Sequence, residues 1–103
     1  MAMYRRVLTG RVSPGRHSDF LRAVEAALDY QAKRGIEAQF SVWDSITGPA
    51  SNVEIIAEFE DLKELEQFEE LAAQDQRFAE LRRAVREAMV FESAEIHIYR
   101  NLV

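Results

Sequence analysis

The sequence contains no cysteine among its 103 residues. A disulfide framework, a thiol nucleophile and a thiolate metal site are therefore excluded. Glycine and proline are scarce, with 4 and 2 residues, which is typical of a globular chain rather than a fibrous or disordered one. Apolar runs are short, and none approaches the roughly 20 residues of a membrane-spanning helix. We therefore expect no membrane association.

Positive charge is also in short supply, because 13 basic residues face 18 acidic ones and the formal net charge is -5. A chain with this balance lacks the basic surface that binds a phosphate backbone, so we expect no nucleic-acid partner. Residues 1–6 show neither the apolar stretch nor the small-residue cleavage site of a signal peptide. The simplest interpretation is a cytoplasmic protein.

The chain length indicates one domain, which we assign to residues 1–103. A chain of this size buries roughly 60–70% of its unfolded surface, which leaves little reserve of stability. Association that covers further apolar surface would therefore help the chain.

The periodicity of apolar residues changes several times along the chain and predicts the order β-α-β-β-α-β. Period-two alternation or β-forming composition predicts strands over 4–12, 38–46, 53–59 and 94–99. Helical spacing predicts helices from about 18 to 34 and from about 62 to 89. We therefore expect an α+β, ferredoxin-like fold, with a four-stranded antiparallel sheet and its helices on one face.

Capping residues mark the ends of these helices. Ser18 or Asp19 can begin the first helix, and Gly35 stands where a left-handed residue would end it. Asp61 and Glu64 have the spacing of a capping box at the start of the second helical region.

Two further residues predict local irregularities. Asp75 interrupts the second helical region as a fresh capping residue, and we expect a kink or short break there. Gly10 lies within the first strand, where it indicates a bulge or a close approach of another part of the chain.

Alternation within the strands separates the two faces of the sheet. One face, expected to pack on the helices, carries Phe40, Val42, Ile55, Ala57, Phe59, Ile96 and Ile98. The other face carries Ser41, Trp43, Glu54, Ile56, Glu58, Glu95, His97 and Tyr99. Two helices on one side leave this second face uncovered, with Trp43, Ile56 and Tyr99 exposed beside one another. Because a grouped apolar patch usually marks an interface or a ligand surface, we expect a homodimer paired through this face.

The element order, the chain length and residues 71–81 (Leu-Ala-Ala-Gln-Asp-Gln-Arg-Phe-Ala-Glu-Leu) resemble the dimeric α/β-barrel superfamily. Within it, the likeness is to NIPSNAP-like and antibiotic-biosynthesis-monooxygenase-like small proteins. The resemblance implies that two sheets pair into a shared barrel. It does not select a function, because this fold hosts oxygenases, haem-degrading enzymes, isomerases and cyclases. The Trp-Asn-His set of the haem-degrading members is not matched, since Asn52 and Asn101 lie in a loop and in the tail.

His97 is the residue with the clearest potential for acid–base chemistry. It shares its face with Glu95 and Tyr99, and a carboxylate from a neighbouring strand, Glu54 or Glu58, could complete the set. The alternative is a histidine that only makes polar contacts at a dimer interface. His17, which precedes a helix, is expected at the surface.

Trp43 can serve as the floor of a pocket for an aromatic molecule or as an interface anchor. We therefore take His97 and Glu58 as candidate catalytic residues, and Trp43, Tyr99 and Glu54 as candidate substrate-binding residues. Two distant histidines and no cysteine predict no metal site, and we expect no cofactor.

Charge is unevenly distributed in the second helical region. Acidic residues dominate from 58 to 70, whereas basic residues dominate from 77 to 86. One interpretation is a binding patch for a charged ligand, and the other is a solvated helical surface whose charges follow the helix dipole.

The sequence leaves two functional interpretations open. The first is a homodimeric protein of unassigned activity that binds a hydrophobic small molecule in a NIPSNAP-like manner. The second is a cofactor-free monooxygenase-like or isomerase-like enzyme that acts on an aromatic or polycyclic metabolite.

Overall fold

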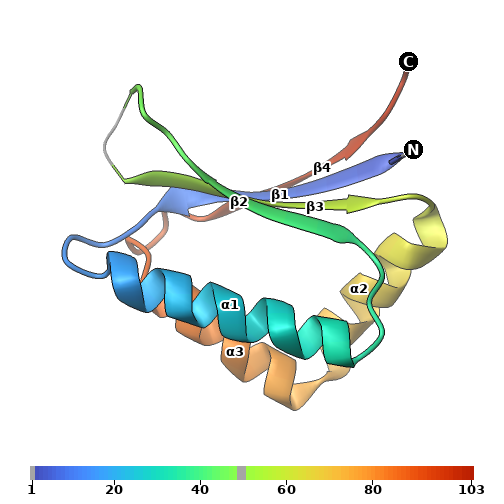
Figure 1. The fold of residues 1–103 in the computed structure, drawn as a ribbon, viewed down its shortest axis with the longest axis horizontal. Helices are drawn as coiled ribbons and strands as arrows, with labels where there is room; N and C mark the ends of the chain where they lie inside the picture. Colours follow the sequence, from blue (N-terminus) through green and yellow to red (C-terminus); the bar gives the residue numbers. More distant parts are fainter. Residues whose placement is uncertain (1, 49–50) are drawn as a thin grey trace.

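The computed structural model describes residues 2–48 and 51–103, which form a sheet layered on helices (Figure 1). The elements are β1 (Tyr4–Arg11), α1 (His17–Lys33), β2 (Gln39–Asp44), β3 (Asn52–Phe59), α2 (Leu62–Gln74), α3 (Gln76–Glu87) and β4 (Glu95–Arg100). The predicted order of elements is confirmed, with the second helical region divided in two. The loop predicted between the hairpin strands includes Pro49 and Ala50, which lie outside the described residues. None of the helices in the described part of the chain could span a membrane.

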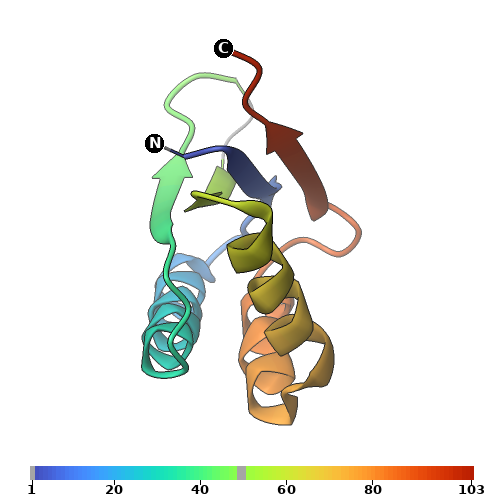
Figure 2. The same ribbon diagram turned by 90° about the vertical axis from the view of Figure 1, so that its right-hand side faces the viewer.

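The sheet is antiparallel throughout, in the order β2-β3-β1-β4. β1 therefore lies between β3 and β4, and Arg6 stands opposite Ala57 on one side and Ile98 on the other. All three helices cover the same face of the sheet (Figure 2). We call the face away from the helices the open face.

The start of α1 differs from the prediction. The helix begins at His17, its N-cap is Arg16, and no side chain caps it. A turn closed by the Arg16 amide donating to the Ser13 carbonyl (3.0 Å) starts the helix earlier than Ser18 or Asp19 would. Asp19 instead lies in the first turn and accepts a hydrogen bond from Arg16 Nε at 2.8 Å.

The predicted caps of the other helix ends are confirmed. Asp61 accepts a hydrogen bond from the Glu64 amide at 2.9 Å, and Glu64 accepts one from the Glu60 amide at 2.8 Å. Asp75 separates α2 from α3 and accepts from the Phe78 amide at 2.9 Å. Gly35 follows α1 with a φ of 81°, in the left-handed region that favours glycine.

Aromatic residues dominate the core at one end of the molecule. Phe59 and Phe78 are fully buried there, as is Phe20 in the neighbouring, mainly aliphatic cluster. The ring of Phe68 lies 5.7 Å from that of Phe59 and 5.8 Å from that of Phe78, centroid to centroid. Burying each of these side chains stabilises the fold by roughly 1.5–3 kcal/mol.

Two predicted core positions on β4 are wrong. Ile96 and Ile98 point to the helical side, as the alternation requires, but they are 40% and 52% exposed. β4 is an edge strand, and all six of its residues are exposed because the helices do not cover it. Leu62, at the start of α2, is also exposed.

Gly10 lies at a close approach rather than a bulge. The pairing of β1 with β3 is regular through Gly10, which stands opposite Val53. A Cβ at this position would collide with the terminal methyl of Met89 and would lie 3.3 Å from the Ala94 Cα. The missing side chain therefore lets the chain after α3 pass close to β1.

Candidate functional site

The open face consists of three rows of side chains that run across the four strands in register. In the order β2, β3, β1, β4, the rows are Gln39–Glu58–Arg5–Tyr99, Ser41–Ile56–Val7–His97 and Trp43–Glu54–Thr9–Glu95. All five candidate site residues, His97, Glu58, Trp43, Tyr99 and Glu54, thus lie on one face, as the alternation predicts.

The three apolar groups expected together are in fact spread across this face. Trp43 and Tyr99 lie on opposite edge strands and in opposite outer rows, and they are 60% and 54% exposed. Ile56 lies between them and is half-buried, and Val7 beside it is only 6% exposed. Alternation identified the face but not the strand order, which separates the two aromatic residues.

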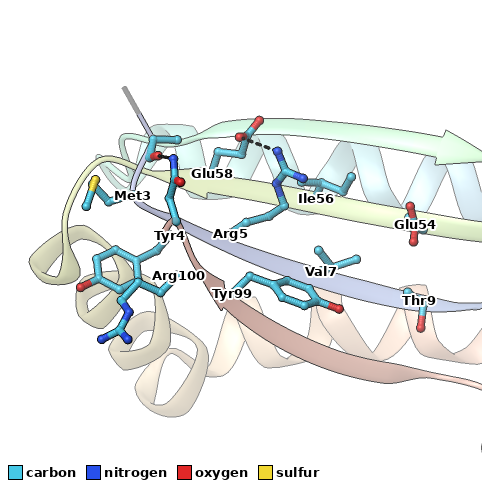
Figure 3. Close-up of a pocket in the computed structure, with 12 residues that line it drawn as sticks. Met3, Tyr4, Arg5, Val7, Thr9, Glu54, Ile56, Glu58, Tyr99 and Arg100 are labelled. Atoms are coloured by element: carbon cyan, nitrogen blue, oxygen red, sulfur yellow. Dashed lines mark hydrogen bonds and ion pairs between the residues drawn. The ribbon is translucent and has the colours of Figure 1, made fainter. Parts of the chain in front are cut away.

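One hollow of the open face, with a volume of ≈ 600 Å³, lies at the end where β1 begins. Figure 3 shows Val7, Ile56 and Tyr99 along it, with Arg5 reaching across to Glu58. The Arg5 Nη2 to Glu58 Oε2 distance is 3.2 Å. The hollow therefore combines an apolar floor with an ion pair on its wall.

A second hollow of ≈ 880 Å³ adjoins the first and is lined by Trp43, Glu92 and Glu95. Both hollows share Thr9, Glu54 and Ile56 as lining residues. The open face is thus concave along most of its length. Trp43 is positioned at this end by a 2.9 Å hydrogen bond from its Nε1 to Ser41 Oγ.

His97 is paired with a residue of its own strand. Its Nε2 lies 3.2 Å from Glu95 Oε2, and its ring stacks at 6.2 Å on the ring of Tyr99. Glu58, the expected partner of His97, is instead paired with Arg5. The structure therefore brings together His97, Glu95 and Tyr99, and it places Glu58 in a separate ion pair.

Sequence reasoning missed a second polar cluster, on the helical side of the sheet. Arg6 is only 7% exposed, its Nε donates to Glu69 Oε1 at 3.1 Å, and its guanidinium lies 4.9 Å from the ring centroid of Phe68. Burial lowers the pKa of Arg6. Because side chains alternate along β1, Arg6 lies on the same side of the sheet as Leu8. This alternation in the sequence could have identified Arg6 as a buried residue.

A third cluster joins the helices. Asp75 accepts a hydrogen bond from the Tyr30 hydroxyl at 2.7 Å and lies 3.5 Å from Arg34 Nε. The hydrogen bonds from the Phe78 amide and the Tyr30 hydroxyl lower the pKa of Asp75. Oδ2 of this carboxylate therefore holds α1 to the α2–α3 junction, while Oδ1 caps α3, which indicates a structural role.

No protein-family model matches the sequence, and no curated protein matches it significantly. Solved structures do resemble it. A conserved protein from Methanosarcina mazei superposes with a TM-score of 0.78 at 22% identity, over 99% of this chain and 95% of that one. A candidate antibiotic biosynthesis monooxygenase from Bordetella bronchiseptica gives a TM-score of 0.75 at 20% identity, over 100% of both chains.

A NIPSNAP family protein from Agrobacterium tumefaciens gives a TM-score of 0.73 at 21% identity, over 98% of this chain and 87% of that one. The chain has a ferredoxin-like fold. The expected likeness to NIPSNAP-like and antibiotic-biosynthesis-monooxygenase-like proteins is thereby confirmed in the fold. Because identities are low, the ferredoxin-like fold is what these neighbours establish, and function depends on the residues of this chain.

Proposed function

We propose that this protein is a homodimer that pairs through its open faces and binds a hydrophobic small molecule between them, in a NIPSNAP-like manner. The observation that carries the proposal is the concave open face, with two adjoining hollows and the exposed rings of Trp43 and Tyr99 at its two ends. Pairing two such faces would enclose the hollows and remove both rings from water.

The mixed chemistry of the face suits an aromatic or apolar ligand with a polar group. Val7, Ile56 and Tyr99 offer apolar contact, whereas Arg5 and Glu58 offer hydrogen bonds. Binding pockets combine these features, a predominantly apolar wall and a few polar groups that orient the ligand. Trp43 and Glu54 would contact the ligand at the other end.

Light scattering coupled to size-exclusion chromatography tests the pairing. We expect a mass near twice the 11.9 kDa of one chain. Ile56→Lys places a charge at the centre of the open face and should yield a monomer. Leu21→Lys, at an exposed position on α1, is the matched control and should leave the dimer intact. A wild-type monomer at micromolar concentration would remove the basis of the proposal.

Ligand binding can be followed through Trp43, which is the only tryptophan in the sequence. We expect an aromatic or polycyclic ligand to quench its fluorescence or shift its emission in a saturable manner, and the Ile56→Lys monomer to bind more weakly. If no compound of a hydrophobic aromatic panel changes the Trp43 emission of an intact dimer, the proposed ligand binding is contradicted. The proposed dimer would not be affected by that result.

A cofactor-free monooxygenase-like or isomerase-like activity on an aromatic or polycyclic metabolite is the second candidate. The observation that favours it is the contact of His97 with Glu95 beside the Tyr99 ring, because a carboxylate next to an imidazole supports proton transfer. His97 would be the acid–base group, with Glu58 contributing from the adjacent Arg5 pair.

His97→Ala separates catalysis from assembly. If His97 acts on a ligand, the variant should dimerise like the wild type and lose turnover or binding of the aromatic panel. A variant that no longer dimerises would assign His97 to the interface, and one that dimerises and binds normally would end its role in the site.

The expectations that the protein uses no cofactor, binds no metal and is located in the cytoplasm remain predictions.

A further inference from the structure

A small cavity lies between the sheet and the helices, on the side of the sheet opposite to the open face. Its volume is ≈ 60 Å³. The polar groups that line it are Gln31 on α1, Arg6 on β1, and Arg82 and Arg86 on α3. The rest of the lining is apolar and includes Leu8, Ala57, Phe68 and Phe78.

The side-chain amide of Gln31 has no acceptor among the residues that the structure describes. The residue is 4% exposed, and its Nε2 is buried without a hydrogen-bond partner in the described structure. Leaving a buried donor unpaired is costly, so such groups are rare in native proteins and call for a partner. A ligand oxygen in the cavity would supply that partner.

Positive charge is in excess around the same cavity. Three guanidinium groups line it, whereas none of its described lining residues is acidic. Glu69 binds Arg6 from outside the lining, through one oxygen at 3.1 Å. Burial is the main cause that lowers the pKa of Arg6 and of Arg82. The positive charge of Arg86 lowers both pKa values further, whereas the negative charge of Glu69 raises them. The cavity thus favours an anion.

The exposure of the arginines indicates where the cavity opens. Arg6 is buried, Arg82 is intermediate and Arg86 is exposed, so the series leads from the interior to the surface. Ile98 pairs with Arg6, and Ile96 with Leu8, on the same side of the sheet. These two isoleucines are exposed, and they provide an apolar ledge beside the buried arginine.

We propose that this cavity binds a small organic carboxylate with a short apolar body. The carboxylate accepts hydrogen bonds from Gln31 Nε2 and from the guanidinium groups of Arg6 and Arg82, while the apolar body lies outward along Ile96 and Ile98. Guanidinium–carboxylate pairs are strong and geometrically specific, and a volume of this size admits a carboxylate group but not a bulky ring.

This site does not depend on pairing through the open face, because every residue in it lies on the helical side of the sheet. The two proposals therefore fail separately. The Ile56→Lys monomer should bind the carboxylate as the wild type does.

Hexanoate and its neutral analogue hexanamide are suitable probes for calorimetric titration of the full chain. We expect hexanoate to bind at least about tenfold more tightly than hexanamide, because the amide offers no charge to the guanidinium groups. In a ¹H–¹⁵N NMR titration with hexanoate, the side-chain amide signals of Gln31 should shift. The dissociation constant from this shift should equal the one from the calorimetric titration.

Arg82→Gln and Arg83→Gln form a matched pair, since both remove one positive charge from α3 but only Arg82 lines the cavity. Arg82→Gln should weaken hexanoate binding about tenfold or more, whereas Arg83→Gln should change it less than about twofold. Arg86→Gln, at an exposed position, provides a second test if Arg82→Gln is poorly folded by circular dichroism, and it should also weaken binding. Gln31→Glu, which places a carboxylate in the cavity, should abolish hexanoate binding.

Any one of four results would overturn the proposal. The first is equal affinity for hexanoate and hexanamide, and the second is an equal loss of hexanoate affinity in Arg82→Gln and Arg83→Gln. The third is the absence of both binding heat and a shift of the Gln31 amide signals at millimolar hexanoate. Retention of binding by Gln31→Glu would likewise exclude the cavity as the site.

Discussion

The hydroxyl of Tyr30 donates a 2.7 Å hydrogen bond to Oδ2 of Asp75 and thereby ties the end of α1 to the junction between α2 and α3. The same carboxylate caps α3 through its Oδ1 atom. Stacking of the Tyr30 ring on Phe78, with centroids 6.2 Å apart, continues this contact into the core.

This relationship predicts a pH dependence of stability. The folded-state pKa of Asp75 is lowered by the hydrogen bonds from Phe78 and Tyr30, so its contribution is present above the unfolded pKa of about 4 and is lost as pH falls through the folded value. The pKa of Tyr30 is raised, first by its hydrogen bond to Asp75, so its contribution is present below about 10 and is lost at higher pH.

Tyr30→Phe should therefore lower the free energy of unfolding most between about pH 4 and pH 10, with smaller differences from the wild type on either side. The NMR-determined pKa of Asp75 should rise toward its usual value in this variant. Tyr4→Phe, on β1, serves as the control and should leave the Asp75 pKa unchanged. An unchanged Asp75 pKa in Tyr30→Phe would show that the hydrogen bond is not maintained in solution.

Phe78→Ala should destabilise the fold by roughly 3–5 kcal/mol in urea unfolding, because the side chain is 1% exposed and contacts the rings of Phe68 and Tyr30. Phe91→Ala removes the same group from a position that is 89% exposed and should cost less than about 0.5 kcal/mol. A loss below about 1 kcal/mol for Phe78→Ala would contradict its placement in the core.

Asp61→Ala should cost about 1 kcal/mol, since it removes the acceptor for the Glu64 amide at the start of α2. Asp29→Ala is a suitable control, because Asp29 forms an exposed i,i+4 ion pair with Lys33 and such pairs contribute about 0.5 kcal/mol or less. If Asp61→Ala and Asp29→Ala lose the same free energy of unfolding in chemical denaturation, the Asp61 cap contributes no more than a surface charge does.

Gly10→Ala should destabilise the protein, because the new methyl meets the end of the Met89 side chain and the Ala94 backbone. Met89 is flexible and can move, so the cost of Gly10→Ala should be smaller in a Met89→Ala background. A double-mutant cycle of unfolding free energies measures this coupling. If the losses of unfolding free energy in Gly10→Ala and Met89→Ala are additive, the new methyl clashes with the Ala94 backbone alone.

Much of the fold could be predicted from the sequence because the relevant signals are local. Asp61 and Asp75 accept hydrogen bonds from amides three residues ahead, so the two helix starts could be recognised from spacing. The α1 start could not, because Arg16 caps without its side chain and the preceding turn sets the boundary.

The burial of side chains depended on tertiary arrangement and was harder to predict. Alternation assigns Ile96 and Ile98 to the helical side, but only the position of the helices determines that nothing covers them. The same limitation hid Arg6, because a charged residue in a strand is usually exposed. Gln31 follows Phe20, Val24 and Ala27 at helical spacing, yet the lack of a partner for its amide among the described residues becomes visible only when the surrounding side chains are placed.

The central position of β1 has a consequence for how the chain folds. Its two neighbours, β3 and β4, are synthesised long after it, and Thr9 pairs with Glu54 on one side and Glu95 on the other. During synthesis β1 therefore emerges without a partner strand, and its exposed edges are open to association with other chains until the later strands arrive. Because these sheet contacts are distant in sequence, we expect slow, cooperative folding compared with a helical bundle of similar length.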